Sequence, residues 1–315
     1  MLKVLICIVI GIAVAALIVH AIANAREARA EVDFPPEGMF LDVDGTRVHA
    51  VVMGAGPDLV LIHGSSGNAR DMTFSLAPRL ASRYRVIVFD RPGLGYTERL
   101  NDTGATLVQQ ATLLRAAARQ LGAPTPILMG QSYGGAVALA WAAHYPGDIA
   151  ALIPVAAASN PWDTPLSLFY RITSSRMGQA LLVPLLTAFV PESVVENAVE
   201  SVFAPQTAPK GYAAHIGARM TLRRGSLRAN GDQRKNILAE IKDLVPFYQN
   251  ITASTEIVHG TADTTVGLSI HSNRLVHQIA GARLTMLSGI GHMVHHSAED
   301  AVVAAIDRAV ERAGL

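Results

Sequence analysis

Apolar runs and helical patterns alternate along most of the chain. Helical spacing of apolar positions marks residues 107–121, 136–144 and 299–312. Asp44-Gly45, a strong two-residue turn signal, predicts a hairpin formed by residues 40–44 and 47–53. The runs with the length of buried strands are 59–62, 85–89, 126–129, 149–156, 255–258 and 283–287. Apolar strands that alternate with helices predict a mostly parallel sheet covered by helices on both faces.

One long stretch, residues 160–250, interrupts this alternation. It contains several prolines and apolar helical patches such as 179–190, but no convincing strand. We expect it to form a helical cap over the carboxyl ends of the strands, where open α/β sheets bind their ligands. The expected organisation is therefore a core made of residues 40–159 and 251–315, with residues 160–250 as the cap.

The N-terminal stretch differs most from the rest of the chain. Residues 4–23 are apolar except for His20, and about 20 apolar residues are enough for a helix to cross a bilayer. We expect residues 1–25 to form an uncleaved membrane anchor and residues 26–39 to form a linker. A cleaved secretory signal, with Ala23-Asn24-Ala25 as its cleavage site, and a buried soluble helix are the alternatives.

The charges around this stretch bear on membrane orientation. Lys3 favours a cytoplasmic N-terminus, whereas Arg26 and Arg29 pull the other way. We expect a single-pass N-terminal anchor with the catalytic part outside the cytoplasm.

Composition narrows the classes of function. The formal net charge is +1 over 315 residues, and no basic patch is interleaved with aromatic residues, so nothing points to nucleic acid. The single cysteine, Cys7, lies in the apolar N-terminal stretch, which excludes an intrachain disulfide and a cysteine metal site. The partners we expect are a small molecule and, through the N-terminal helix, a membrane.

Ser132 is the candidate nucleophile. It lies in Gly130-Gln-Ser-Tyr-Gly134, between a predicted strand and a predicted helix, which is the context that makes a G-x-S-x-G motif credible. The glycines suit a sharp turn, because side chains there would clash with the neighbouring backbone. A tight structural turn with an incidental serine is the alternative.

A serine hydroxyl is a weak nucleophile and needs a general base. His292 lies in a loop directly after the last predicted strand, which places it at the carboxyl edge of the sheet, on the same side as Ser132. His295 and His296 are close rivals, but we expect one or both of them to face the following helix or solvent. His292 is therefore the candidate base.

The base in turn needs an orienting group, and Asp263 is the candidate acid. It follows the strand at 255–258, where a carboxylate would fix the imidazole tautomer and stabilise the imidazolium. Asp163 is the rival acid, and an Asx turn at Asp263 is the structural alternative. The order Ser132, Asp263, His292 matches nucleophile, acid and base in hydrolases with this elbow.

The backbone N–H groups of Ser65 and Tyr133 are the candidates for an oxyanion hole. Ser65 lies in His63-Gly64-Ser-Ser-Gly67, where small residues after a strand let N–H groups face the cleft. We expect His63 to fix this loop by hydrogen bonds rather than to act as the base.

The remaining glycine and histidine clusters indicate neither a cofactor nor a metal. Asp90-Arg-Pro-Gly-Leu-Gly95 lacks the third glycine of a dinucleotide fingerprint, and no Gly-Lys-Ser/Thr follows it. The histidines at 292, 295 and 296 have a tempting spacing, but the chain contains no His-Glu-x-x-His.

Together these motifs resemble the α/β-hydrolase superfamily. The matching pieces, in the family's order, are His63-Gly64, residues 90–95, residues 130–134, residues 260–263 and Gly291-His292. The resemblance implies an α/β-hydrolase fold with an eight-stranded, mostly parallel sheet and a helical cap, here preceded by a transmembrane helix. The Asp-Arg-Pro-Gly-x-Gly piece is similar to the branch of epoxide hydrolases and haloalkane dehalogenases. Those enzymes use Asp as nucleophile, and this chain has Ser132 instead.

The expected function is that of a serine hydrolase without a cofactor. It would cleave an ester-like bond, in a lipophilic carboxylic ester or as a carbon–carbon bond, through an acyl-enzyme. One alternative is an acyltransferase or a haloperoxidase-like perhydrolase with the same triad. The other is a non-catalytic, membrane-tethered binding protein on a hydrolase scaffold.

Overall fold

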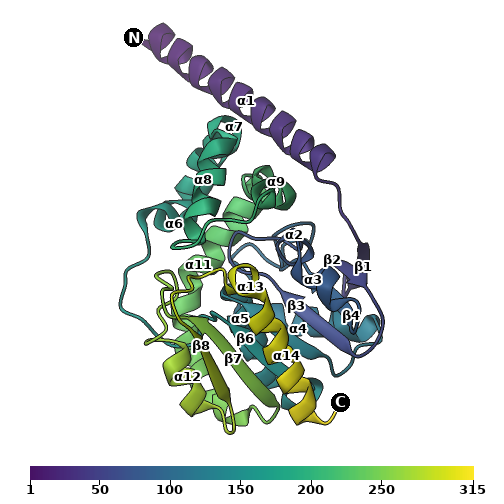
Figure 1. The fold of residues 1–315 in the computed structure, drawn as a ribbon. Coiled ribbons are helices and arrows are strands. Elements are labelled where there is room, and N and C mark those ends of the chain that lie inside the picture. Colours follow the sequence, from purple (N-terminus) through teal and green to yellow (C-terminus); the bar gives the residue numbers. More distant parts are fainter.

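The computed structural model describes residues 1–315 and contains one eight-stranded sheet. The strand order is β1-β2-β4-β3-β5-β6-β7-β8 (Figure 1). β2 pairs antiparallel with β1 and β4, and all other neighbours are parallel. The strands are β1 (Met39–Val43), β2 (Thr46–Met53), β3 (Asp58–Ile62), β4 (Arg85–Phe89), β5 (Ile127–Gln131), β6 (Ala151–Val155), β7 (Ser254–Gly260) and β8 (Arg283–Leu287). The predicted hairpin and the mostly parallel sheet are confirmed.

Helices cover both faces of the sheet because the central strands are apolar on both sides. Val60 and Ile62 of β3 pack into one apolar layer, and the alternate residues Leu59 and Leu61 pack into the other. The first layer lies under α4 (Leu107–Gln120), α5 (Tyr133–His144) and α12 (Ser272–Gln278), the second under α2 (Arg70–Thr73), α3 (Leu76–Leu80) and α14 (Glu299–Ala313). The sequence pattern predicted α4, α5 and α14, whereas α2, α3 and α12 were not predicted because they are short.

A helical region separates β6 from β7 and lies over the carboxyl ends of the strands (Figure 1). It contains no strand, as the sequence predicts. Its elements are α6 (Leu168–Thr173), a π-helical turn η2 (Gly178–Leu182), α7 (Val183–Phe189), α8 (Glu192–Val202), α9 (Tyr212–Ile216), α10 (Ala218–Thr221), α11 (Arg224–Leu244) and the 3-10 helix η3 (Val245–Asn250). The short helices η1 (Pro146–Asp148) and α13 (Val294–Ser297) belong to the core.

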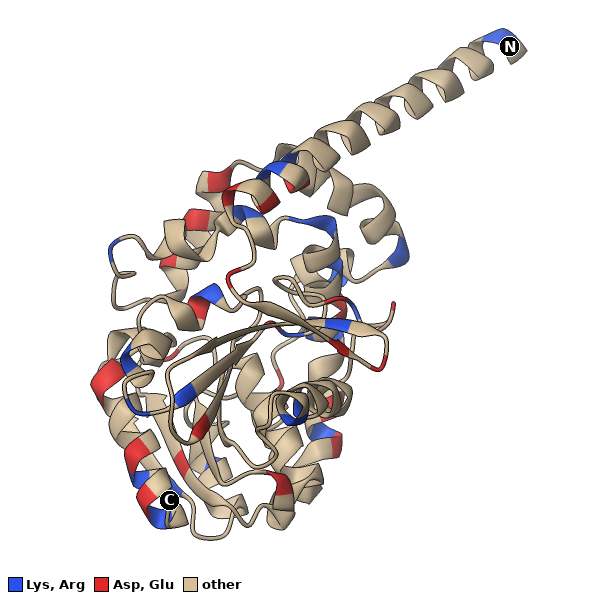
Figure 2. Ribbon diagram, turned by 90° about the vertical axis from the view of Figure 1, so that its right-hand side faces the viewer, with Lys and Arg blue, Asp and Glu red and all other residues tan.

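The N-terminal helix α1 (Leu2–Asp33) is the one helix long and apolar enough to cross a membrane. It projects away from the rest of the molecule, and its shaft carries no charged residue between Lys3 and Arg26 (Figure 2). The most apolar segment of α1 is not buried against the rest of the protein. These features are compatible with a membrane anchor and also with a signal sequence.

The helix is longer than the sequence analysis predicts, because the first part of the expected linker at 26–39 is helical up to Asp33. The charged residues of this segment pair with arginines of the cap: Glu27 lies 2.6 Å from Arg224, and Asp33 lies 2.8 Å from Arg219. These contacts across the chain stabilise the added turns of helix, and no sequence pattern could indicate them. The extended connection between α1 and β1 is therefore shorter than the predicted linker.

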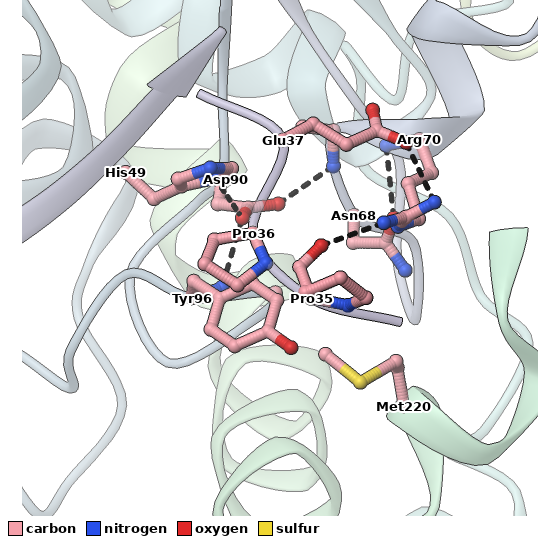
Figure 3. Close-up of a pocket in the computed structure, with 11 residues that line it drawn as sticks. Pro35, Pro36, Glu37, His49, Asn68, Arg70, Asp90, Tyr96 and Met220 are labelled. Carbon is pink, nitrogen blue, oxygen red and sulfur yellow. Dashed lines mark hydrogen bonds and ion pairs between the residues drawn. The ribbon is translucent and has the colours of Figure 1, made fainter. Parts of the chain in front are cut away.

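The connection between α1 and β1 is packed against the core (Figure 3). The Glu37 carboxylate lies 2.6 Å from Arg70, which also donates a hydrogen bond of 2.7 Å to the Pro35 carbonyl. The Tyr96 hydroxyl donates to the Phe34 carbonyl at 2.5 Å. These contacts fix where α1 leaves the core.

Candidate active site

Ser132 lies at the sharp turn between β5 and α5, with a φ of 54°. This conformation is rare for a residue with a side chain and exposes the hydroxyl at the edge of the sheet. The flanking glycines are required by contact: a Cβ on Gly130 would lie 2.2 Å from the Gly134 carbonyl oxygen, and one on Gly134 would lie 2.3 Å from that of Ile62. The turn that carries Ser132 therefore requires glycine at both flanking positions, which distinguishes it from an ordinary loop.

The three candidate side chains meet, although Ser132 and Asp263 are 131 positions apart in the sequence. His292 Nε2 lies 3.0 Å from Ser132 Oγ, and His292 Nδ1 lies 2.7 Å from Asp263 Oδ2. All three residues are buried. The distances are those of hydrogen bonds, so the hydroxyl, the imidazole and the carboxylate form one continuous chain.

Asp263 is held as an anion by donors on both oxygens. Its Oδ1 accepts the backbone N–H groups of Thr265 and Val266, each at 2.8 Å. Its Oδ2 lies 3.2 Å from His259 Nε2 as well as facing His292. Burial alone raises the pKa of the Asp263 carboxyl, but the hydrogen bonds from His259 and His292 outweigh it, and the pKa lies well below its usual value.

His259 is a site residue that the sequence analysis missed. Its Nδ1 lies 2.6 Å from Ser272 Oγ, while its Nε2 lies 2.8 Å from the Val266 carbonyl oxygen. Carbonyl and carboxylate oxygens only accept, so Nε2 carries the proton and Nδ1 accepts from the Ser272 hydroxyl. The spacing of four residues before Asp263 is the signal by which the sequence could have indicated it.

The rival residues lie elsewhere. Asp163 is exposed and forms no contact with His292. His295 and His296 face Asp71, with Nε2 atoms 3.1 and 2.9 Å from its Oδ1. The expectation that they face the following helix or solvent was therefore wrong, because α13 turns both rings toward the buried carboxylate of α2.

The side chains of Asp71, His295 and His296 also lie close enough together that they could serve as ligands of a metal ion. The Nδ1 atoms of both imidazoles are buried without a hydrogen-bond partner, whereas metal-binding imidazoles usually donate the opposite N–H to an acceptor. The Tyr212 hydroxyl of the cap donates to Asp71 at 2.6 Å. These contacts explain the cluster as a polar link between the core and the cap.

The candidate oxyanion loop is fixed from two sides. The Ser66 N–H donates to Asn230 of α11 at 3.0 Å, and the Asn230 amide donates to Ser66 Oγ at 2.8 Å. Ser65 lines the cavity beside Ser132, and neither the Ser65 nor the Tyr133 N–H donates to a protein acceptor. Neither N–H group is therefore occupied by a hydrogen bond within the protein.

His63 fixes the base of this loop, as the sequence analysis expects. Its Nδ1 donates to the Gly64 carbonyl at 2.9 Å, and its Nε2 accepts the Arg91 N–H at 3.0 Å. Burial, with a smaller contribution from Arg91, lowers the pKa of His63 to about 4, so the imidazole is neutral at pH 7. A neutral imidazole engaged on both nitrogens is unsuited to be the base.

Residues 90–95 have a structural role. The Asp90 carboxylate accepts the N–H groups of Ala69 and Tyr96 at 2.6 and 2.8 Å and lies 2.7 Å from His49 Nδ1 (Figure 3). The buried Arg91 guanidinium donates to the carbonyls of His63 and Gly64, each at 3.0 Å. The motif thus holds the oxyanion loop in place.

A cavity of about 560 Å³ opens onto these residues between the core and the cap. Ser65, Ser132 and His292 are among its 32 lining residues, of which 17 are hydrophobic. Most of the apolar lining comes from the cap, including Phe169, Leu186, Val194, Phe203 and Leu222. The arrangement combines a hydroxyl within hydrogen-bond distance of an imidazole with a largely apolar chamber.

The fold and this site define a hydrolase of the α/β type, and comparison with known proteins agrees. The model of the alpha/beta hydrolase family matches residues 59–305, so the chain belongs to that family.

Three similar proteins illustrate the range of the family. The 2-hydroxy-6-oxononadienedioate/2-hydroxy-6-oxononatrienedioate hydrolase of Klebsiella pneumoniae subsp. pneumoniae is 26% identical, over 80% of this chain and 88% of its own length. Haloalkane dehalogenase 2 of Mycobacterium tuberculosis is 25% identical, over 89% of this chain and 96% of its own length. The crystal structure of a membrane phospholipase A has a TM-score of 0.64 at 19% identity and covers 98% of this chain and 99% of its own, so the structural match extends into α1.

Proposed function

We propose that this hydrolase is a serine enzyme that cleaves ester-like bonds through an acyl-enzyme on Ser132. The observation that carries the proposal is the hydrogen-bonded chain Ser132–His292–Asp263, of which Ser132 and His292 line the cavity. Hydroxyl, imidazole and carboxylate in this order are what nucleophilic acyl transfer needs.

The proposed reaction begins when Ser132 Oγ attacks the substrate carbonyl and its proton moves to His292 Nε2. The Ser65 and Tyr133 N–H groups bind the oxyanion, and such donors contribute about 3 kcal/mol each in other enzymes. His292 then protonates the leaving group. Water activated by His292 hydrolyses the acyl-enzyme, while Asp263 remains ionised throughout.

The cavity supports a substrate with a large apolar part. Its lining is mainly hydrophobic, and burial of apolar surface contributes about 25 cal/mol per Å². A lipophilic carboxylic ester fits this lining. A carbon–carbon bond next to a carbonyl is the second candidate, because the Klebsiella relative is named as a hydrolase of 2-hydroxy-6-oxo dioates.

The proposal is tested by labelling with a fluorophosphonate and by hydrolysis of a panel of esters. The Ser132→Ala variant is expected to lose both labelling and turnover. Ser201→Ala, at an exposed serine of α8, is the matched control and is expected to retain both. Labelling that persists in folded Ser132→Ala would contradict the assignment of the nucleophile.

We also infer that residues 160–250 act as a cap on a core made of residues 40–159 and 251–315. The support is that this segment supplies most of the cavity's apolar lining, while the core supplies Ser132 and His292. Substitutions in the cap are therefore expected to alter KM and substrate preference more than fluorophosphonate labelling of Ser132.

We further infer that α1 is an uncleaved anchor and that the cap faces the membrane. Large apolar residues are exposed at intervals of four from the residue before η2 to the end of α7: Met177, Leu181, Leu185 and Phe189. Residues at this spacing share one face of a helix. α7 packs beside α1, so this exposed stripe lies next to the proposed anchor.

Intact mass measurement of the chain recovered from membranes tests the anchor. A full-length chain that resists alkaline carbonate extraction is the expected result, and a chain beginning near residue 26 would contradict it. Protease protection in vesicles of known orientation tests the proposal that the catalytic part lies outside the cytoplasm.

A further inference from the structure

Arg234 of α11 is a cation without a counter-ion at the cavity. Its side chain lines the cavity together with Ser132 and His292. No carboxylate lies within 4 Å of it, and its Nε atom is buried without a hydrogen-bond partner. Its guanidinium carbon lies 5.1 Å from the centroid of the Tyr170 ring, which also lines the cavity.

The other arginines differ from Arg234 in exposure or in hydrogen bonding. Arg228 also has a buried Nε without a partner, but its guanidinium donates to the Gln179 carbonyl. Four more arginines lack an acceptor within the protein, but all four are exposed to water: Arg171, Arg176, Arg274 and Arg283. Arg91, which is fully buried, donates to four acceptors instead. The buried Nε–H of Arg234, without a hydrogen-bond partner, is costly unless a ligand satisfies it.

The position of Arg234 is tied to the acyl site. It lies one helical turn after Asn230, and residues four apart share a helix face. Asn230 holds Ser66 of the oxyanion loop by two hydrogen bonds. The helix that presents the guanidinium is therefore fixed relative to the place where the substrate carbonyl would be attacked.

We propose that Arg234 binds an anionic group of the substrate, so that the enzyme acts on acyl compounds that combine an apolar part with a carboxylate or a phosphate. This inference rests on the proposed function. The planar guanidinium can donate two parallel hydrogen bonds to either anion. Stacking over Tyr170 orients it, and the apolar lining around it strengthens the attraction.

The test compares pairs of substrates that differ only in the anion. One pair is methyl butyrate and monomethyl succinate, and the other is a monoacylglycerol and the lysophosphatidic acid with the same acyl chain. Each is measured with the wild type, Arg234→Gln and Arg234→Lys. Arg171→Gln, which removes an exposed arginine of the cap, is the control.

We expect Arg234→Gln to lower kcat/KM roughly ten- to hundredfold for the anionic member of at least one pair, mainly through KM, and about twofold or less for the neutral member. Arg234→Lys should recover part of the loss because it keeps the charge but not the fork. The pair that responds identifies the anion. Equal losses for both members of each pair, or no loss, would overturn the proposal.

A binding measurement separates this inference from the proposed function. Calorimetry of lysophosphatidic acid and of monomethyl succinate with Ser132→Ala, alone and combined with Arg234→Gln, needs no turnover. Weaker binding in the double variant supports the anion site even if Ser132 proves not to be the nucleophile. Unchanged binding in the double variant removes the anion site and leaves the assignment of Ser132 untouched.

Discussion

Replacement of Asp263 by Asn changes the hydrogen-bonding capacity of the site while keeping the size of the side chain. The carboxylate faces four donors: the Thr265 and Val266 N–H groups at 2.8 Å, His292 at 2.7 Å and His259 at 3.2 Å. An ionised carboxylate accepts from all four, whereas Asn offers one oxygen and one NH₂ group. Two donors must therefore face the NH₂ group.

The backbone N–H groups cannot stop being donors, but an imidazole can change tautomer. In Asp263→Asn we therefore expect the oxygen of the introduced amide to stay on the backbone N–H groups and its NH₂ group to face His292 Nδ1. Nδ1 then becomes the unprotonated nitrogen, and Nε2 carries the proton. His292 can no longer accept the proton of Ser132. The corresponding change in a serine protease lowers kcat about 10⁴-fold, and we expect a loss of this order.

The assay combines the rate of fluorophosphonate labelling with kcat/KM for a neutral ester, and thermal unfolding shows whether the variant is folded. Asp163→Asn is the matched control, because Asp163 is exposed and was the rival acid. It is expected to behave like the wild type. A folded Asp263→Asn protein that retained kcat/KM within about tenfold would refute the role assigned to Asp263.

Three further outcomes are expected. His259→Gln removes a donor to Asp263 and should lower kcat about tenfold with little change in KM, and a loss seen only in KM would contradict a positioning role. Gly134→Ala should lower thermal stability by about 1–3 kcal/mol, because the new Cβ would lie 2.3 Å from a backbone oxygen of β3, whereas Gly147→Ala, with no atom within 4 Å, should not. Burial raises the pKa of Glu240 to about 7 from 4.5. The stability that this carboxyl contributes is complete below pH 4.5 and is lost as pH rises through about 7. In denaturant titrations, the free energy of unfolding of Glu240→Gln relative to that of the wild type should therefore be up to about 3 kcal/mol higher at pH 8 than at pH 4. Parallel pH profiles of the two proteins would count against this.

Most of the sheet could be predicted from the sequence because buried parallel strands are continuous apolar runs. The runs at 59–62 and 85–89 became β3 and β4 with bounds within one residue. The short helices α2 and α12 were missed because four to seven residues give too few turns for a helical period to show. The helical end of the expected linker was missed because arginines of the cap stabilise it.

The candidate site likewise contains residues that the sequence could predict and residues that it could not. Ser132, Asp263 and His292 could be chosen from the sequence because each follows a strand, and parallel strands end at one edge. The catalytic roles of these residues stay predictions, although the structure places their polar atoms within hydrogen-bond distance. His259 and Arg234 could not be chosen in this way, since their importance depends on which atoms face them.

The sequence by itself determined the succession of strands and of the long core helices, the sharp turn at Ser132 and the long apolar helix at the N-terminus. These features follow from local rules: the period of apolar residues, the small size of glycine and the length of an uninterrupted apolar run. Only the tertiary structure decided that His259 supports Asp263, that Asp71 gathers His295 and His296, and that Arg234 lacks a counter-ion. The physical reason is that hydrogen bonds and charge pairing act over a few ångströms in space, whereas the partners lie up to 225 residues apart in the chain.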